Sequence, residues 1–179
     1  MQVKFRIQVG KYRGRIISTP EEDMRPTMGW AREVIFNWLQ NIHNKSMLDA
    51  CTGSGIFALE AISSGIKTAL CIDSNYANLK HLQQQALLLD IDINLTILHH
   101  VWPNSWTAPQ PFDLIFWDPP YQASWRHDIW SLCEEGKWLT PTGYLIIESH
   151  ATDSYHHDNW IQVKYHKRGH TQLQLFKSL

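Results

Sequence analysis

The ten residues Phe112-Asp-Leu-Ile-Phe-Trp-Asp-Pro-Pro-Tyr121 decide the fold that this sequence predicts. Residues 112–117 form a short apolar run in which Asp113 is the only polar residue, which is typical of a strand buried on both faces of a parallel sheet. Two prolines then stop the hydrogen-bond ladder, because proline has no N–H group to donate. Residues 118–121 therefore stand just beyond the carboxyl end of a strand, where ligands bind in open α/β sheets.

The tetrapeptide Asp118–Tyr121 presents a carboxylate, stiff backbone carbonyls and an aromatic ring together. The Asp118 side chain and a nearby carbonyl can accept both protons of an NH2 group, while the Tyr121 ring stacks on the plane that carries it. Fixing both N–H bonds turns the nitrogen lone pair toward an electrophile. An ordinary turn after a strand explains the tetrapeptide alone equally well. A second motif is needed to favour a binding site over a turn.

That second motif is a strand–turn–helix–strand unit upstream. Residues 46–51 predict a buried strand, Thr52-Gly53-Ser54-Gly55 a glycine-rich turn, residues 56–63 a helix, and residues 68–73 a strand that ends at Asp73. Asp73 follows Gly55 by 18 residues (73 minus 55), close to the roughly 20-residue interval at which an acid binds a ribose in nucleotide-binding folds.

The glycine turn indicates which nucleotide fits. It lacks the third glycine of the dinucleotide fingerprint and the Lys-Ser/Thr pair of a P-loop, so a phosphate is not favoured. A nucleoside-like ligand with little or no phosphate remains, and S-adenosylmethionine satisfies this description. Asp49, at the end of the first strand, is then placed to hold the amino group of its methionine part. A purely structural glycine turn is the alternative.

The other segments extend this α/β pattern at both ends. Residues 3–9 and 15–18 predict a basic β-hairpin, and Thr27 is expected to N-cap a helix that runs to about residue 41. Arg25 and Arg32 are expected to face solvent or to reach a carboxylate or a phosphate. Further helices are predicted at 75–89 and 125–136, and further strands at 93–98, 143–149, 160–166 and 171–176, the last two as an antiparallel hairpin around Gly169.

Charge is distributed unevenly along a chain of 179 residues with a formal net charge of −1. The length predicts one domain with a substantial core. Basic residues gather near both ends, which indicates an anionic partner that touches both ends; a solvated basic face is the alternative. The two clusters are Lys4, Arg6, Lys11, Arg13 and Arg15, and Lys164, His166, Lys167, Arg168 and His170.

Cysteine and histidine spacing argue against a disulfide framework and a metal centre. Cys51, Cys71 and Cys133 are odd in number and widely spaced, which is typical of free thiols in a reducing compartment. The histidine pairs at 99–100 and 156–157 lack the i, i+4 spacing of helical metal ligands. We see no signal peptide and no apolar run long enough to span a membrane, so we expect a cytoplasmic protein.

In order along the chain, Asp49-x-x-x-Gly53-x-Gly55, Asp73 and Asp118-Pro-Pro-Tyr121 resemble the motifs of amino-group methyltransferases that use S-adenosylmethionine. The match narrows to the RsmD family, bacterial methyltransferases of guanine N2 in small-subunit (16S) ribosomal RNA. The likeness covers nearly the whole chain and is most specific from Arg25-Pro26-Thr27 through Arg32-Glu33 to Phe36-Asn37-Trp38-Leu39. Other similar segments are Arg13-Gly14-Arg15, Leu48-Asp49 with Gly53-Ser54-Gly55, and Leu59-Glu60-Ala61.

The resemblance implies an α/β fold, that of a Rossmann-like class I methyltransferase. Its sheet is expected to be mostly parallel and seven-stranded, with an antiparallel C-terminal hairpin and a small N-terminal β-arm. We expect a single methyltransferase domain over residues 1–179, in which residues 1–24 form the basic arm and residues 25–179 the Rossmann-like core.

The resemblance also implies direct transfer of a methyl group to a guanine that has left its stack, with S-adenosyl-L-homocysteine as the product. The expected partner is 16S rRNA or the assembling small subunit, bound by a monomer without a metal, and phosphate contacts make binding salt-dependent. The implied residues are Asp118, Pro119, Pro120 and Tyr121 for catalysis; Asp49, Cys51, Gly53, Gly55, Asp73, His100 and Val101 for the cofactor; and Arg13, Arg15, Arg25, Thr27, Arg32, Lys167 and Arg168 for RNA.

Three other functions are compatible with parts of the pattern. A methyltransferase of the same fold that acts on DNA bases or on a protein glutamine uses nearly the same tetrapeptide. A non-catalytic ribosome-assembly factor would keep the fold without binding the cofactor, an idea motivated by His100, which stands where the family usually carries Asp or Asn. A nicotinamide dehydrogenase is disfavoured by the missing third glycine.

Overall fold

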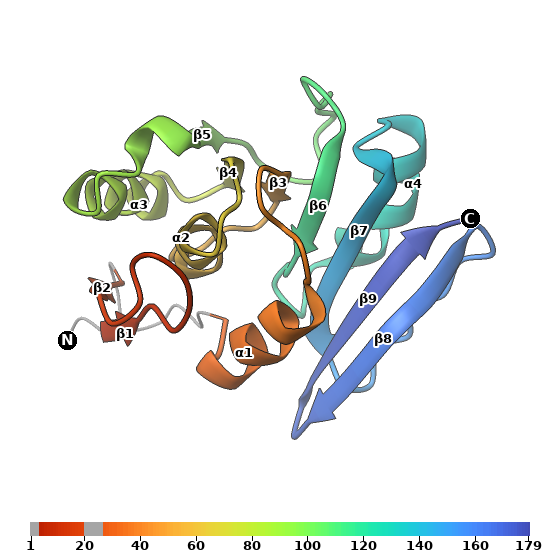
Figure 1. The fold of residues 1–179 in the computed structure, drawn as a ribbon. Helices are drawn as coiled ribbons and strands as arrows, with labels where there is room; N and C mark the ends of the chain where they lie inside the picture. The colour runs from red at the N-terminus through yellow and green to blue at the C-terminus, as the bar shows by residue number, and fades with distance from the viewer. Residues whose placement is uncertain (1–3, 20–26) are drawn as a thin grey trace. The chain divides into compact units, whose positions relative to one another are not determined.

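The computed structural model describes residues 4–19 and 27–179 (Figure 1). The described residues divide into two compact units, a first unit that ends at Val101 and a second unit over residues 102–179. The first unit holds the N-terminal arm, three strands of the main sheet and three α-helices. The second unit holds four strands of the main sheet and one α-helix. In the part of the chain that is described, no helix is long and apolar enough to cross a membrane.

The N-terminal arm is an antiparallel hairpin of β1 (Lys4–Arg6) and β2 (Ile16–Ser18), as predicted, although its strands are shorter than the sequence suggested. The turn between them is fastened to the end of a helix, since the backbone N–H of Lys11 donates to the carbonyl of Ser63 at 2.8 Å. Gly10 has φ +78°, and a Cβ there would collide with that carbonyl. Glycine is therefore required where the arm approaches the core.

The nucleotide-binding half of the first unit is the predicted parallel arrangement. Its strands lie in the order β5 (Leu95–His99), β4 (Thr68–Asp73), β3 (Ser46–Asp49), with Asp49 opposite Cys71 and Asp73 opposite His99. Their carboxyl ends therefore meet at one edge. The connecting helices are α2 (Ile56–Ser63) and α3 (Tyr76–Leu88), with a 3₁₀ turn at Asp92–Asn94.

Helix α1 (Gly29–Trp38) differs from the prediction at its start. The N-cap is Met28, which makes no side-chain capping bond, and not Thr27. Thr27 instead turns its backbone carbonyl toward Arg32, whose Nη1 donates to it at 2.6 Å. The helix therefore begins where a buried arginine satisfies the preceding carbonyl, and the threonine hydroxyl is not its cap.

The second unit carries the strands β6, β7, β9 and β8 in that order, with β6–β7 parallel and the last three antiparallel. Trp117 lies opposite Ile147, and His150 lies opposite Thr171. The carboxyl end of β6, the end of β7 and the β8–β9 turn thus share one edge. The bounds are β6 (Phe112–Trp117), a 3₁₀ turn (Ser124–His127), α4 (Ile129–Glu135), β7 (Leu139–His150), β8 (Trp160–Arg168) and β9 (Thr171–Ser178).

Aromatic side chains form much of the core of the second unit. Trp117 and Trp138 are fully buried, and Trp130 of α4 packs edge-on against Phe176 of β9 with ring centroids 5.0 Å apart. The three cysteines are free thiols, as predicted, and burial raises the pKa of Cys71 and of Cys133 well above the ordinary thiol range. Both buried cysteines are therefore protonated and unreactive.

Candidate active site

The first candidate site is built around Asp49, the last residue of β3. Its side chain is 1 % exposed, and the Thr52 hydroxyl donates to its Oδ2 at 2.9 Å. The other oxygen, Oδ1, is buried and has no hydrogen-bond partner among the described residues. A buried carboxylate oxygen without a partner is costly, so this position is suited to a ligand that supplies a hydrogen-bond donor.

The electrostatic state of Asp49 supports the same conclusion. Burial raises the pKa of its carboxyl group to about 7. Hydrogen bonds from the Thr52 hydroxyl and the Cys51 backbone N–H oppose this rise, and repulsion from Asp73 adds to it. Asp49 is thus near its titration point at neutral pH. A cation that binds next to Oδ1 would favour the ionised form and lower the pKa.

Asp73 joins the glycine turn to the end of β4. Its Oδ2 accepts the backbone N–H of Gly53 at 2.8 Å, and its Oδ1 accepts that of Asn75 at 2.7 Å. The carboxylate is half-buried and retains lone pairs for a further donor. The turn therefore presents its backbone and this carboxylate on the same side of the strand end.

The other residues predicted to bind the cofactor surround this strand edge. The backbone N–H of His100 donates to the carbonyl of Asp73 at 3.1 Å, which places His100 beside it. Val101 is 46 % exposed and Cys51 is half-buried. Gly55 has φ +73°, and a Cβ there would collide with the Leu82 side chain, so only glycine fits this turn.

These groups fit S-adenosylmethionine better than a phosphorylated nucleotide. The unpaired Oδ1 of Asp49 suits an ammonium group, and the half-buried carboxylate of Asp73 suits ribose hydroxyls. Neither acid suits a phosphate, because both carry negative charge when ionised. Asp49 and Asp73 would hold the cofactor, with His100 and Val101 beside it.

The second candidate site, in the second unit, is the tetrapeptide after β6. Asp118 and Tyr121 are half-buried, Pro119 is buried and Pro120 is exposed. The Pro120 carbonyl accepts the backbone N–H of Ala123 at 2.9 Å, which holds the prolines in a tight turn. The Tyr121 hydroxyl lies 3.2 Å from Oγ1 of Thr171. The motif is therefore rigid at both ends.

Three residues near Tyr121 were not among the predicted site residues. Thr171 hydrogen-bonds its hydroxyl, and the ring of His150 lies edge-on to the Tyr121 ring with centroids 5.6 Å apart. His170 stacks on His150 with centroids 5.8 Å apart. The only sequence signal was the predicted hairpin around Gly169, because its pairing with β7 is what brings these side chains to the end of β6.

The residues predicted to contact RNA fall into two groups. Arg13, Arg15, Lys167 and Arg168 are exposed and remain candidates. Arg25 lies outside the described residues. For Arg32 and Thr27 the prediction needs correction, because these residues are only 2 % and 6 % exposed.

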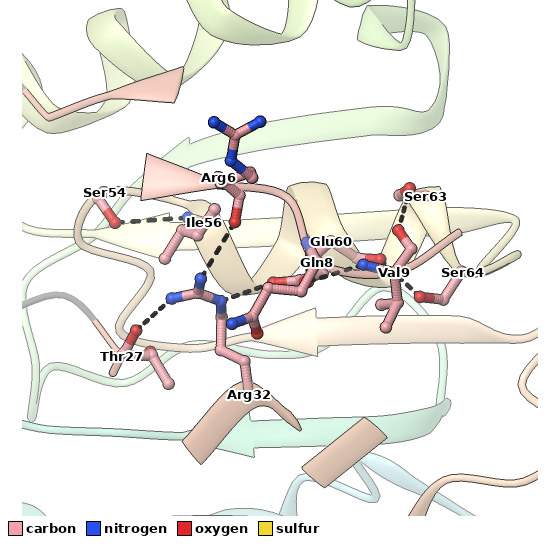
Figure 2. A network of polar contacts seen from close by, with 10 residues as sticks. All are labelled: Arg6, Gln8, Val9, Thr27, Arg32, Ser54, Ile56, Glu60, Ser63 and Ser64. Atoms are coloured by element: carbon pink, nitrogen blue, oxygen red, sulfur yellow. Dashed lines mark hydrogen bonds and ion pairs between the residues drawn. The ribbon is translucent and has the colours of Figure 1, made fainter. Parts of the chain in front are cut away.

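Arg32 is part of a buried polar network instead (Figure 2). Its Nε donates to Oε2 of Glu60 at 2.6 Å, while Oε1 of Glu60 accepts the backbone N–H groups of Gln8 and Val9. Nη2 of Arg32 reaches the carbonyl of Arg6 at 3.4 Å. Of the alternatives that the sequence predicts for Arg32, the structure shows contact with a carboxylate. The Arg32–Glu60 pair connects the N-terminal arm to α1 and α2.

A protein-family model described as conserved hypothetical protein 95 matches residues 5–177. Two curated relatives are both called ribosomal RNA small subunit methyltransferase D. The relative from Buchnera aphidicola (subspecies Acyrthosiphon pisum) is 32% identical, and the match covers 97% of this chain and 92% of the relative. The relative from Haemophilus influenzae is 31% identical, with 98% and 94% covered.

Solved structures agree with the predicted fold. The protein yhhF from Escherichia coli is 26% identical, with a TM-score of 0.86 over 98% of each chain. The methylase HI0767 from Haemophilus influenzae, 24% identical, superposes with a TM-score of 0.85 over 99% of each chain and supports the fold alone. The prediction of a class I methyltransferase fold with a mostly parallel seven-stranded sheet and antiparallel C-terminal strands is therefore confirmed.

Proposed function

The chain belongs to the conserved hypothetical protein 95 family, that of the small-subunit ribosomal RNA methyltransferases D, and from this premise we propose that it transfers a methyl group from S-adenosylmethionine to N2 of a guanine in 16S rRNA. The observation that carries the proposal is the buried, unpaired Oδ1 of Asp49 beside the glycine turn. A fold that had lost its cofactor would have no reason to keep this group, which disfavours a non-catalytic assembly factor.

On this proposal, the first unit holds the cofactor. Asp49 binds the ammonium group through Oδ1, the backbone at Gly53 and Gly55 faces the methionine part, and Asp73 accepts the ribose hydroxyls. His100 and Val101 flank the adenine. When bound, S-adenosylmethionine supplies a methyl group on a sulfonium, which is already a good leaving group, so no strong base is required before attack.

The second unit orients the target. The Asp118 carboxylate and the Pro119 carbonyl each accept a hydrogen bond from one N–H group of the guanine amine, while the Tyr121 ring stacks on the base. After the methyl group has been transferred, the nitrogen carries an extra proton, and this proton passes to water. Catalysis rests on orientation of the amine, a class of effect that can supply about 7–11 kcal/mol. Rigid prolines and the hydrogen bond between Tyr121 and Thr171 serve this purpose.

The reaction is tested by incubating the protein with methyl-labelled S-adenosylmethionine and small ribosomal subunits from a strain that lacks it. The RNA is then digested and the labelled nucleoside identified. We expect labelled N2-methylguanosine. Label in adenine or cytosine would discard guanine N2 but keep the chemistry, and label only in DNA or in a protein glutamine would move the enzyme to another substrate class.

Replacement of Asp118 by alanine is expected to lower the methyl-transfer rate on the order of 100-fold, the loss typical of removing one positioned hydrogen-bonding group. The dissociation constant of S-adenosylmethionine should stay unchanged. Asp118→Asn should retain most of the activity, because the amide oxygen still accepts an N–H bond. Single-turnover rates measure both variants, and Asp158→Ala, which changes an exposed acid of the same unit, is the control. Equal loss in the Asn and Ala variants would instead indicate a proton-accepting role.

The exposed arginines of the arm should contribute to RNA binding through phosphate contacts alone. We expect Arg13→Ala and Arg15→Ala each to lower the magnitude of the slope of log K against log salt by about one. Filter binding of the small subunit's RNA at several salt concentrations measures this slope. An unchanged slope in the double variant would remove the arm from the RNA interface.

A further inference from the structure

A band of three aromatic rings, Tyr121, His150 and His170, runs along one edge of the second unit. The Tyr121 and His150 rings meet edge to face, with an interplanar angle of 70°. His150 and His170 lie nearly parallel, with an interplanar angle of 9°. Their centroid distances of 5.6 and 5.8 Å fall in the range of favourable ring pairs. The band thus continues the predicted base-binding ring toward the tip of the β8–β9 hairpin.

The surrounding backbone and hydroxyl groups hold this band in place. The Thr171 side chain, which is 3 % exposed, contacts the Tyr121 hydroxyl. Nδ1 of His150 lies 2.7 Å from Oγ1 of Thr152. The His170 carbonyl accepts the backbone N–H of Ala151 at 2.9 Å, which ties the hairpin turn to the end of β7. The rings are therefore positioned before any ligand arrives.

The band is accessible and has cationic neighbours. His150 is half-buried and His170 is exposed. Lys167 and Arg168, on the last two residues of β8, are exposed as well, and Nζ of Lys167 donates to the Ala151 carbonyl at 3.2 Å. Ring faces beside cations are the features with which proteins bind single-stranded RNA, since bases stack on the rings and phosphates meet the cations.

We propose that this band binds the nucleotide next to the target guanine. His170 stacks on the neighbouring base, Lys167 and Arg168 contact its phosphate, and His150 positions the Tyr121 ring. The proposal rests on the proposed function, because it takes Tyr121 as the residue that stacks on the target base. On this proposal the β8–β9 turn holds the RNA strand open beside the target guanine. The extruded guanine no longer stacks on its neighbour, so the neighbouring base is free to stack on His170.

The test compares His170→Ala with His170→Phe on small ribosomal subunits that lack the modification. We expect the alanine variant to raise KM for the subunits roughly 5- to 150-fold, the range that loss of one base–aromatic stack produces, with kcat and the cofactor dissociation constant nearly unchanged. The phenylalanine variant keeps a ring and should restore KM. His156→Ala, which removes an exposed histidine paired with Asp158, is the matched control and should behave as the unaltered protein.

Two outcomes would contradict the proposal that the band binds RNA. One is a KM for His170→Ala equal to that of His156→Ala, and the other is a KM for His170→Phe that stays as high as that of His170→Ala. A second measurement separates this result from failure of the reaction itself. Fluorescence anisotropy with a labelled single-stranded RNA decamer reports binding without methyl transfer. If the unaltered protein labels no RNA but His170→Ala still weakens decamer binding, the reaction assignment fails and the RNA surface stands.

Discussion

Replacing Asp49 by asparagine is expected to stabilise the cofactor-free protein at pH 8 by roughly 1–3 kcal/mol. Removing the carboxyl group gains about 4 kcal/mol, because about 3 pKa units separate the folded and unfolded states and each unit corresponds to about 1.36 kcal/mol. Burying the asparagine NH2 group at the Oδ1 position without a partner costs about 1–3 kcal/mol of this gain. The folded carboxyl group has a pKa of about 7, above the ordinary aspartate value of 3.8. A raised carboxyl pKa costs nothing below pH 3.8, and the cost grows as pH rises toward 7 and is complete above it. Asparagine removes this cost, while its amide oxygen can still accept the Thr52 hydroxyl.

The same substitution should weaken S-adenosylmethionine binding, because the ammonium group loses its carboxylate. In the unaltered protein, affinity should rise about tenfold per pH unit between pH 5 and 7, since the cofactor requires the ionised form. Urea unfolding and calorimetric titration across this range measure both effects, with Asp158→Asn, at a 98 % exposed side chain, as the control. A variant that is no more stable than the unaltered protein at pH 8 would show that Asp49 already has a compensating partner.

Local signals predicted much of the fold because strands and helices here are short runs with clear ends. The bounds of β6 (Phe112–Trp117), α2 (Ile56–Ser63) and β4 (Thr68–Asp73) agree with the prediction to the residue. Two prolines, Pro119 and Pro120, follow closely on the end of β6, and Gly55 directly precedes α2. Asn75 likewise precedes α3 and caps it by accepting the N–H of Ala77. In each case the neighbouring residues carry the information.

The remaining features depend on partners that are distant in the sequence. Asp49 and Asp73 lie at the same edge because parallel strands align their carboxyl ends. The order of strands and helices along the sequence is enough to predict this arrangement. The ring of His150 beside Tyr121 depends on the register in which His150 faces Thr171. No local periodicity carries that register, so the sequence alone does not predict that the three rings lie together.

Arg32 shows why a basic side chain in a motif need not contact RNA. Its partner Glu60 is 28 residues away and is 0 % exposed. A helical pattern treats an arginine as a surface residue, because charged side chains are rarely buried without a partner. Here the partner exists, and the cost of burying the arginine is offset by the carboxylate and by backbone carbonyls at Thr27 and Arg6.

Glu60→Ala is therefore expected to lower the free energy of unfolding by about 3–5 kcal/mol, the cost of leaving one member of a buried ion pair without its partner. The substitution also removes the acceptor of two hydrogen bonds, which the backbone N–H groups of Gln8 and Val9 donate to Glu60. Urea unfolding measures the loss. Glu33→Ala, which removes an exposed acid one residue from Arg32, should change stability by less than about 0.5 kcal/mol.

The consequence should extend from stability to the arm. Because Glu60 fastens residues 8 and 9, its loss should release the hairpin before the core unfolds, and trypsin should then cut at Lys4, Arg6 or Lys11 under native conditions. RNA affinity should fall with it, since Arg13 and Arg15 would no longer be held. If Glu60→Ala destabilises the protein while the arm stays protected from trypsin, the tie between Lys11 and Ser63 would be sufficient to hold the arm, and the buried pair would serve α1 and α2 alone.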